Sequence, residues 1–328
     1  MEYPKFKVCV RCFTFNQADY IEDAMNGFTM QQTDFPFVCC IVDDASTDGE
    51  QDVIKKYMDM HFDYSPNSVS FEKETDYAYI HYAQHKENKN CYFAVLFLKS
   101  NLYSKKENYL KYIYIAEWRE SCEYEAICEG DDYWINPLKL HLQVDFLDRH
   151  PDFGMVRTDS NVYYQDINLT IDSVFKNKLY PNCEDTFVDY VVRPCWLATC
   201  SWLIRTPIGD YEDLPKDCFT GDLALMIYIA KKSKVKYLPV VTTVYRVLKN
   251  SASHFTNSAD TLRFWKSQVN TRCYYARYLS FLNKIIMIKN ILINGRHLFI
   301  NSRTFNLGGF LNLSYDIILR VFKDKKAN

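Results

Sequence analysis

The apolar positions in the first 60 residues alternate between the period of a strand and the period of a helix. Over 6–12 they occupy every second position, as in a strand with one buried face. Over 21–28 they recur three and four positions apart, as on one face of a helix. A continuous apolar run over 37–42 is typical of a strand covered on both faces, and a second helical pattern follows at 53–58. The order strand, helix, strand, helix predicts an α/β fold with a mainly parallel sheet and right-handed crossovers.

The patterns beyond residue 60 are weaker. Residues 61–121 are aromatic and charged, and within them we expect one helix over 93–102. A strand is expected over 124–128, and Pro137 suits the first turn of a helix that follows. In the helix after Pro137 we expect Leu138, Leu142 and Phe146 to face the core. A further helix is predicted to begin near Gly221-Asp222, and further strands are predicted over 154–157, 201–205, 235–238 and 241–245.

The C-terminal region differs from the rest of the chain in charge. The 328 residues have a formal net charge of −2, but 261–328 contains 12 Lys or Arg and only 2 Asp or Glu. Apolar stripes at helical spacing over 279–293 and 310–321 lie among these basic residues. We therefore expect a larger domain over 1–255, followed by a C-terminal region of basic amphipathic helices over 256–328.

A basic amphipathic region has three interpretations: it packs on the larger domain, it binds anionic lipid, or it binds nucleic acid. No nucleic-acid recognition motif accompanies the charge, so we expect no nucleic-acid partner. The sequence shows neither an N-terminal signal nor a run of about 18 apolar residues. We expect a cytoplasmic protein with reduced cysteines, with the basic region as a candidate for peripheral attachment to the inner face of the cell membrane.

Two carboxylate clusters follow predicted strands. The first is Asp43-Asp44, and the second contains Glu129, Asp131 and Asp132. Ligands of open parallel sheets bind at the carboxyl ends of the strands, so both clusters could face one crevice. Adjacent carboxylates repel each other unless a cation or hydrogen-bond donors compensate them, and Mg²⁺ or Mn²⁺ suits such a pair together with substrate phosphates. The other interpretation is two acidic turns that cap helices. Three of the nine glycines adjoin these clusters or the acidic residue at the predicted start of the helix near 221, which favours a functional site: Gly49, Gly130 and Gly221.

Taken in order, the motifs of the chain resemble those of family 2 glycosyltransferases, which are inverting enzymes with the GT-A fold. The resemblance covers about residues 5–255 and implies a Rossmann-like, mixed but mainly parallel sheet flanked by helices. It also implies a bacterial enzyme of polysaccharide or cell-surface glycan synthesis. The motifs are Asn16-Gln17-Ala18-Asp19-Tyr20, Ile41-Val42-Asp43-Asp44-Ala45-Ser46-Thr47-Asp48-Gly49, Glu129-Gly130-Asp131-Asp132-Tyr133-Trp134, Pro137-Leu138-Lys139-Leu140, Gly221-Asp222-Leu223-Ala224-Leu225 and Val244-Tyr245-Arg246-Val247-Leu248.

The resemblance assigns roles to individual positions. The residues implied in binding a nucleotide-sugar donor are Thr14, Phe15, Asn16, Asp43, Asp44, Glu129 and Asp131. Those implied in holding Mg²⁺ or Mn²⁺ are Asp131, Asp132 and His254. Asp222 is implied as the general base that takes a proton from the hydroxyl of a glycan or lipid-linked acceptor. The cation would stabilise the charge that builds on the diphosphate as the sugar leaves.

Each of these assignments has an alternative, and the match has departures. Asp222 precedes an apolar run and also suits a helix cap, whereas a lone His254 is more often structural. Trp134 is a candidate for stacking on the acceptor or a core residue. The segment Cys12-Phe13-Thr14-Phe15 replaces the Pro-Thr-Tyr that the family more usually has. The alternative function is a non-catalytic sugar-nucleotide-binding protein or a membrane-surface scaffold with a degenerate transferase site.

Overall fold

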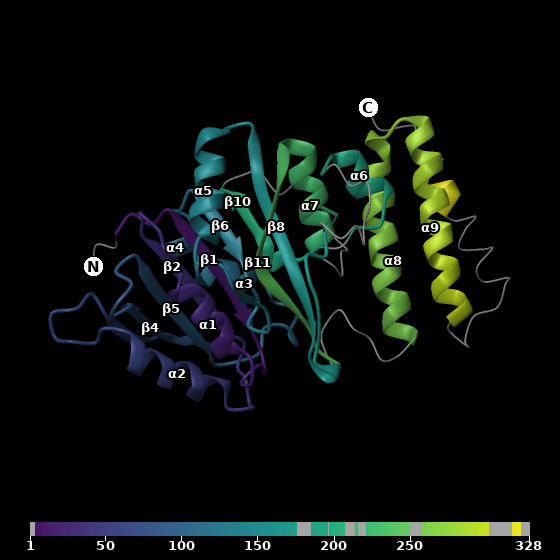
Figure 1. Ribbon diagram of the computed structural model, residues 1–328. Coiled ribbons are helices and arrows are strands. Elements are labelled where there is room, and N and C mark those ends of the chain that lie inside the picture. Colours follow the sequence, from purple (N-terminus) through teal and green to yellow (C-terminus); the bar gives the residue numbers. More distant parts are fainter. Residues whose placement is uncertain are drawn as a thin grey trace. The chain divides into compact units, whose positions relative to one another are not determined.

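The computed structural model describes residues 4–175, 185–195, 197–206, 214–215, 221–249, 258–301 and 317–322. Two compact units divide the chain (Figure 1). The first unit consists of Met1–Asn177, Ala198–Ile208 and Lys236–Arg246. The second unit consists of Lys178–Leu197, Gly209–Val235 and Val247–Asn328.

A mixed sheet with a parallel centre forms the first unit. The parallel strands lie in the order β5 (Cys91–Leu98), β2 (Phe37–Asp43), β1 (Val8–Thr14) and β6 (Tyr124–Ile127). Strands on both sides extend this centre to the order β3-β4-β5-β2-β1-β6-β10-β8-β11-β7, with β9 paired to β8. The added strands are β3 (Phe71–Glu74), β4 (Ala78–Gln84), β7 (Tyr133–Trp134), β8 (Phe153–Tyr164), β9 (Leu169–Ile171), β10 (Trp202–Arg205) and β11 (Lys234–Val247). The prediction of an α/β fold with a mainly parallel centre is confirmed.

Helices cover both faces of the parallel centre. On one face lie α1 (Ile21–Thr29) and α2 (Glu50–His61), where Phe28 and Phe62 contact Phe93 of β5. On the other face lie α3 (Tyr109–Tyr114) and α4 (Ala116–Arg119), where Ile115 and Trp118 join a cluster of buried strand residues. Because both faces are covered, β1, β2 and β5 are almost continuously apolar and buried.

Two local predictions were wrong, and the structure decides between the two alternatives for Trp134. The segment predicted as a helix over 93–102 begins in strand β5, whose continuous apolar run is buried on both faces rather than on one side of a helix. The helix after Pro137 is α5 (Lys139–Arg149), and its buried face is formed by Leu140, Val144 and Leu147 rather than by the stripe that begins at Leu138. Trp134 is a core residue, with its indole N–H donating to Cys200 O over 3.0 Å.

Helices form the described part of the second unit: α6 (Phe187–Val192), α7 (Gly221–Lys232), α8 (Ser258–Tyr275) and α9 (Phe281–Asn301). The helices α7 and α9 were predicted, whereas α8 was not, because its apolar positions form no clear stripe. Asn290 of α9 donates to Val192 O at the end of α6 over 2.9 Å, and Arg272 of α8 donates to Arg193 O over 3.1 Å. No helix within the described residues is long and apolar enough to cross a bilayer.

The described cysteines form no disulfide with one another, and five of the ten lie in the strands β1, β2 and β5. Cys9 and Cys40, on the neighbouring strands β1 and β2, have their sulfur atoms 3.7 Å apart. Burial and the neighbouring thiol raise the pKa of Cys9 well above its usual range, so it is a protonated, unreactive core residue at neutral pH. Cys195 and Cys273, both in the second unit, are partly exposed.

Candidate functional site

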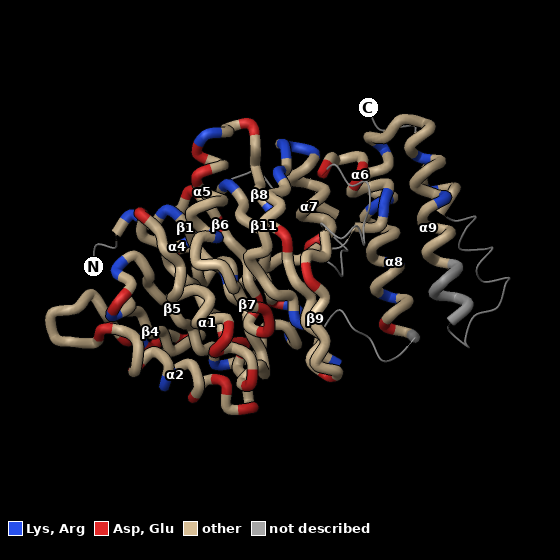
Figure 2. The backbone as a smooth tube through the Cα atoms, in the orientation of Figure 1, with Lys and Arg blue, Asp and Glu red and all other residues tan. Residues whose placement is uncertain are grey.

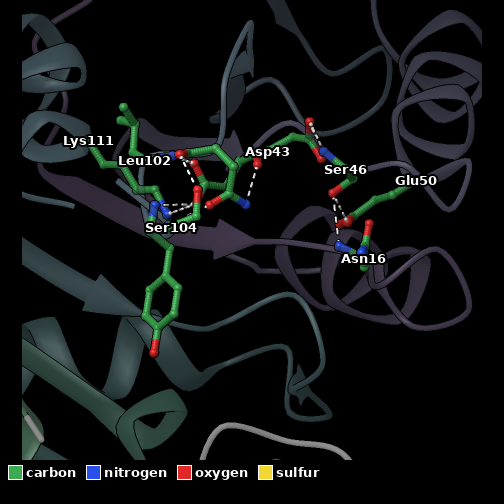
Figure 3. A network of polar contacts seen from close by, with 10 residues as sticks. Asn16, Asp43, Ser46, Glu50, Leu102, Ser104 and Lys111 are labelled. Atoms are coloured by element: carbon green, nitrogen blue, oxygen red, sulfur yellow. Dashed lines mark hydrogen bonds and ion pairs between the residues drawn. The ribbon is translucent and has the colours of Figure 1, made fainter. Parts of the chain in front are cut away.

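The loops after β1 and β2 bind each other through a set of polar contacts (Figure 3). The backbone N–H of Asn16 donates to Ser46 Oγ over 2.9 Å, and that of Thr47 donates to Asn16 Oδ1 over 2.8 Å. Ser46 Oγ in turn donates to Glu50 Oε2 over 2.8 Å. Asn16 and Ala45 have φ angles of 53° and 60°, in the left-handed region that L-residues rarely adopt. Such backbone strain persists only where the surroundings determine it, as these contacts do.

A buried carboxylate lies beneath these loops. Glu50 is fully buried at the start of α2, where it accepts hydrogen bonds from Thr14 Oγ1 and from the backbone N–H of Gln17. Burial raises the pKa of the Glu50 carboxyl. The N-cap position of this helix is Gly49, with a φ of 96°, and the backbone N–H of Glu50 donates to Asp48 Oδ1 over 3.1 Å. Sequence reasoning missed Glu50, because an acidic residue in the first turn of a helix usually only interacts with the helix dipole.

Asp44 directly follows β2, and its buried carboxylate has hydrogen-bond partners on both oxygens. Its Oδ1 accepts from the backbone N–H of Leu102 over 2.7 Å, and its Oδ2 accepts from that of Tyr103 over 3.1 Å. Lys111 of α3 forms an ion pair with Oδ2 over 2.8 Å, and both side chains are buried. No signal in the sequence indicated Lys111, since the pair joins positions 67 residues apart. Asp44 therefore ties the chain at 102–103 and helix α3 to the edge of the sheet.

Asp43 differs from its neighbour because one of its oxygens has no partner. Its Oδ2 accepts from Gln51 Nε2 over 2.5 Å and from the backbone N–H of Ser46 over 3.2 Å. Its Oδ1 is buried and accepts no hydrogen bond within the described residues. Burial raises the pKa of the Asp43 carboxyl. Phe15, at the end of β1, exposes 44% of its surface despite being apolar. An unsatisfied acceptor and an exposed ring at the ends of paired strands are features of a ligand site.

The second cluster follows β6 and lies against the first loop. Gly130 packs so tightly that a Cβ there would lie 2.4 Å from both Thr14 Oγ1 and Gln17 Oε1. Asp132 exposes only 2% of its surface and accepts from the backbone N–H of Arg246 over 2.8 Å. Glu129 accepts from Thr199 Oγ1 over 2.9 Å. The three carboxylates are thus brought close to the end of β1, and Figure 2 shows acidic residues gathered by β7 and α1.

The acidic loop, residues 129–132, carries more negative charge than its surroundings compensate. Burial raises the pKa of Asp131 to about 6, with a further contribution from the charge of Glu129. Burial and the charges of Asp131 and Glu129 raise the pKa of Asp132 well above its usual range. Carboxylates in this condition release a proton readily when a cation approaches, because the cation supplies the missing compensation.

The residues fit a divalent cation that is shared with a phosphate ligand. Among the described residues, no three His, Cys, Asp or Glu side chains are arranged to hold a metal ion by themselves. Mg²⁺ and Mn²⁺ are commonly bound by one or two carboxylates plus substrate phosphates, and Asp131 and Asp132 offer two hard oxygen ligands. His254, predicted as a third ligand, lies outside the described residues.

The structure places most of the predicted site residues together at the carboxyl edge of the first unit. These are Thr14, Phe15, Asn16, Asp43, Asp44, Glu129, Asp131 and Asp132. Asp222 lies in the first turn of α7, in the second unit, and its side chain is exposed. Its predicted role as general base stays a prediction. Gln17 and Arg246 lie in motifs that carry the resemblance, but sequence reasoning gave neither of them a role in the site.

Comparisons with known proteins show a family match over part of the chain. Residues 10–79, which include both strand ends of the first cluster, match the model of the family "Glycosyl transferase family 2". Uncharacterized proteins of Mycobacterium tuberculosis (Rv1520) and Mycobacterium bovis (Mb1547) are each 28% identical over 258 residues. Those alignments cover 78% of this chain but only 62% of the length of the mycobacterial proteins.

Solved structures share the fold at low sequence identity. S. aureus TarS 1-349 in complex with UDP-GlcNAc superimposes with a TM-score of 0.57 at 17% identity, covering 96% of this chain and 82% of TarS 1-349. The UDP complex of the same protein gives a TM-score of 0.56 at 18% identity, with 97% and 82% covered. At this level of identity the likeness establishes the fold alone. Residues 10–79 are thus similar to family 2 glycosyltransferases, and the chain has the GT-A fold that its sequence predicted.

Proposed function

We propose that the protein is an inverting glycosyltransferase that moves a sugar from a nucleotide-diphosphate donor to a hydroxyl of a glycan or lipid-linked acceptor. One observation supports this most strongly. At a single edge of the sheet, an exposed aromatic ring, a buried carboxylate oxygen without a partner and an undercompensated acidic loop lie together. A nucleotide-sugar has a base to stack, ring and ribose groups that donate hydrogen bonds, and a diphosphate that brings a cation.

The donor nucleoside is assigned to Phe15 and Asp43. The ring of Phe15 offers an exposed apolar face for a base, and Asp43 Oδ1 can accept a hydrogen bond from the base or the ribose. Asp44 was predicted to make this contact. Since both its oxygens accept from Leu102, Tyr103 and Lys111, we propose that it acts mainly by holding the adjacent chain in place. The UDP-GlcNAc complex of TarS is consistent with a nucleotide-sugar ligand for this fold.

The diphosphate is assigned to the acidic loop. Asp131 and Asp132 would hold Mg²⁺ or Mn²⁺, and a bound cation would stabilise the charge that the departing diphosphate acquires. Glu129 is oriented by Thr199 and adds negative charge that favours cation binding. Asp222 is proposed as the general base for the acceptor hydroxyl, a contribution typically worth about 10²–10⁴-fold in rate.

A thermal-shift screen with nucleotides tests the donor site. The melting temperatures of wild type and of Asp132→Asn are measured in the presence of UDP, GDP, CDP or dTDP, each with and without Mn²⁺. We expect stabilisation by one nucleotide that depends on Mn²⁺ and is lost in Asp132→Asn, since a ligand at 100 times its Kd adds about 2.7 kcal/mol. The matched control is Asp76→Asn, an exposed aspartate between β3 and β4, which should respond like wild type. No stabilisation of wild type by any nucleotide contradicts the proposal.

The alternative function is nucleotide-sugar binding without transfer. Asp222→Asn separates the two functions, because it removes the proposed base and leaves the first unit intact. A transferase should lose donor turnover in this variant while it retains the nucleotide-induced thermal shift. If wild type binds a nucleotide-sugar but transfers its sugar neither to water nor to any acceptor, the binding protein is the better description.

We further propose an anionic membrane surface as a partner of the second unit, which would place a cytoplasmic enzyme at the inner face of the membrane. Helix α9 is apolar on both sides: Met287, Ile288 and Ile291 are buried, while a second stripe is exposed. Lys289 lies within that stripe, and Figure 2 shows further basic residues along α8 and α9. Exposed apolar side chains with interspersed lysines suit the interface of an anionic bilayer. The exposed stripe consists of Phe281, Leu282, Ile285, Ile286 and Ile293.

Vesicle sedimentation tests the membrane proposal. Wild type should sediment with vesicles that contain about 30% anionic lipid, and less with neutral vesicles or at high salt, where charges are screened. Leu282→Asp should abolish sedimentation, whereas Ile167→Asp, an equally exposed residue of the first unit, should not. Equal sedimentation of Leu282→Asp and wild type, or a change of oligomeric state in that variant, would instead indicate a protein partner for this face.

A further inference from the structure

Arg246 lies behind the acidic loop and contacts it with both its backbone and its side chain. It is the next-to-last residue of β11, and its side chain is 6% exposed. Its backbone N–H donates to Asp132 Oδ1 over 2.8 Å, and its Nε donates to the backbone oxygen of Asp131 over 2.9 Å. One residue thus holds a carboxylate of the loop and the adjacent main chain at the same time.

The other guanidinium nitrogens of Arg246 reach two further elements of the first unit. Nη2 forms an ion pair with Asp23 Oδ2 of α1 over 2.6 Å, and Nη1 donates to Gln165 Oε1 over 2.8 Å. Gln165 begins the short helix η1 (Gln165–Ile167) that follows β8. The guanidinium carbon also lies over the rings of Tyr20 and Tyr133, 4.8 and 5.0 Å from their centroids. Its position is therefore determined from several directions.

This geometry distinguishes two roles for the arginine. A side chain that contacts a ligand directly needs free donors that point towards it. Here three of the five guanidinium N–H groups, one on each nitrogen, donate to protein acceptors, and the guanidinium lies over the rings of Tyr20 and Tyr133. The contacts with the loop are made through a main-chain oxygen and an inward-facing carboxylate oxygen. Both kinds of contact fix the path of the loop.

We propose that Arg246 is a positioning residue that fixes the Asp131-Asp132 backbone and thereby sets the affinity of the acidic loop for a divalent cation. The proposal rests on the function proposed above, in which that loop holds the cation. A fixed loop keeps two like-charged carboxylates close together, instead of letting their repulsion move them apart. Outer-shell partners of metal ligands commonly contribute about 10–100-fold to metal affinity. Lysine cannot replace the arginine, because it lacks the planar fork that reaches three acceptors in fixed directions.

The experiment compares Arg246→Lys, Arg246→Gln and Asp23→Asn with wild type by two measurements. Hydrogen–deuterium exchange of the segment 126–134 is followed in metal-free protein, which reports the fixation of the loop directly. Mn²⁺ binding is then titrated with and without UDP by the electron paramagnetic resonance signal of the free ion. The matched control is Arg205→Gln, since Arg205 in β10 also donates to main-chain oxygens, Phe153 O and Leu147 O, but makes no contact with the loop.

We expect faster exchange in the loop and at least about a tenfold loss of Mn²⁺ affinity in both Arg246 variants. Asp23→Asn should show the same changes at a smaller size, because the contacts with Asp131 and Asp132 remain, and it tests the proposal even if the Arg246 variants fold poorly. Arg205→Gln should lower the melting temperature without changing Mn²⁺ binding or loop exchange.

Unchanged loop exchange in the Arg246 variants and in Asp23→Asn would overturn the proposal. It would also be overturned by wild-type Mn²⁺ affinity together with weaker UDP binding in metal-free buffer, a result that would make Arg246 a direct ligand of the donor. If the loop exchanges faster but wild type binds neither Mn²⁺ nor UDP, the proposed function fails while the fixation of the loop by Arg246 stands.

Discussion

A pair of adjacent aspartates lies at the carboxyl end of each of the two strands beside β1, and the two pairs differ in their partners. Asp43-Asp44 follows β2, and Asp131-Asp132 follows β6. Asp44 has an ammonium group and two backbone N–H groups as partners. Asp132 has a backbone N–H of Arg246 but two further carboxylates nearby, and its pKa is raised well above the usual range.

The difference shows that a pair of aspartates at a strand end has no fixed chemical meaning. The role of each pair depends on the basic residue that the fold brings to it from a distant position in the chain. This residue is Lys111 for Asp44 and Arg246 for the acidic loop. In the first pair, Asp44 forms the ion pair with Lys111, whereas Asp43 has one buried oxygen that accepts no hydrogen bond within the described residues. The second pair keeps an excess of negative charge, which a cation can use.

The largest expected effect tests the claim that Asp44 is structural. Asp44→Asn leaves the buried ammonium of Lys111 without a counter-charge, and breaking a buried ion pair in this way costs about 3–5 kcal/mol. Urea unfolding in metal-free buffer measures it. Asp132→Asn is the matched variant of the other pair, and it should leave the free energy of unfolding unchanged or raise it, because it relieves repulsion. Equal losses in the two variants would show that the pairs do not differ.

The second prediction concerns pH. The pKa of Asp131 is raised to about 6 in the folded protein, above its usual value of 3.8, so the unfolded chain ionises first as the pH rises. Protonated Asp131 therefore stabilises the folded state. This stabilisation is complete below about pH 4, is lost by about pH 6, and is at most about 3 kcal/mol. The difference in unfolding free energy between wild type and Asp131→Asn, measured from pH 4 to 7, should follow this fall. Mn²⁺ should make this fall with pH smaller. A difference between the two proteins that does not change with pH would contradict the prediction.

The third prediction concerns the packing of the acidic loop against β1. A methyl group at Gly130 would overlap Thr14 and Gln17, so Gly130→Ala should cost about 1–3 kcal/mol and weaken nucleotide binding by displacing the loop. Gly221→Ala is the control, because a Cβ at that helical position meets nothing within 4 Å. That variant should keep or slightly raise the melting temperature. If both substitutions behave alike in thermal unfolding, the close approach of the loop has no energetic importance.

The smallest effect should have the opposite sign and concerns the first loop. Ala45 has a φ of 60°, a conformation that costs an L-residue about 1–2 kcal/mol more than it costs glycine. Ala45→Gly should therefore stabilise the protein by up to about 1 kcal/mol, after the greater freedom of glycine in the unfolded chain is subtracted. Chemical denaturation of wild type and variant measures this. A clear loss of stability would indicate that the Ala45 methyl group makes a packing contribution larger than the strain.

Much of the fold could be predicted because its signals are local. The alternating pattern of β1, the apolar run of β2 and the helical spacing of α1 each lie within ten residues. The strand β5 was misread, because a continuous apolar run has no periodicity to distinguish a strand buried on both faces from a buried helix. Helix α8 was missed since no stripe marks it.

The candidate site could be predicted only in part. The acidic residues were found because they directly follow predicted strands. Their partners could not be found, since Lys111 resembles any other basic residue and the motif that contains Arg246 does not show what this arginine contacts until the fold brings them close. Glu50 was hidden for the same reason, as a helix-start acid that the fold buries. Sequence motifs therefore identified the charges of the site, and only the structure showed which of them are already compensated.

The rate at which the buried cysteines are alkylated reports how often the folded protein opens. An alkylating reagent reaches a core thiol such as Cys40 or Cys91 only when the strands around it separate, so its uptake under native conditions times that event. Cys195 and Cys273, which are partly exposed, should react first and report on the second unit. Mass spectrometry of labelled peptides would thus follow the lifetimes of both units in one sample, without any engineered probe.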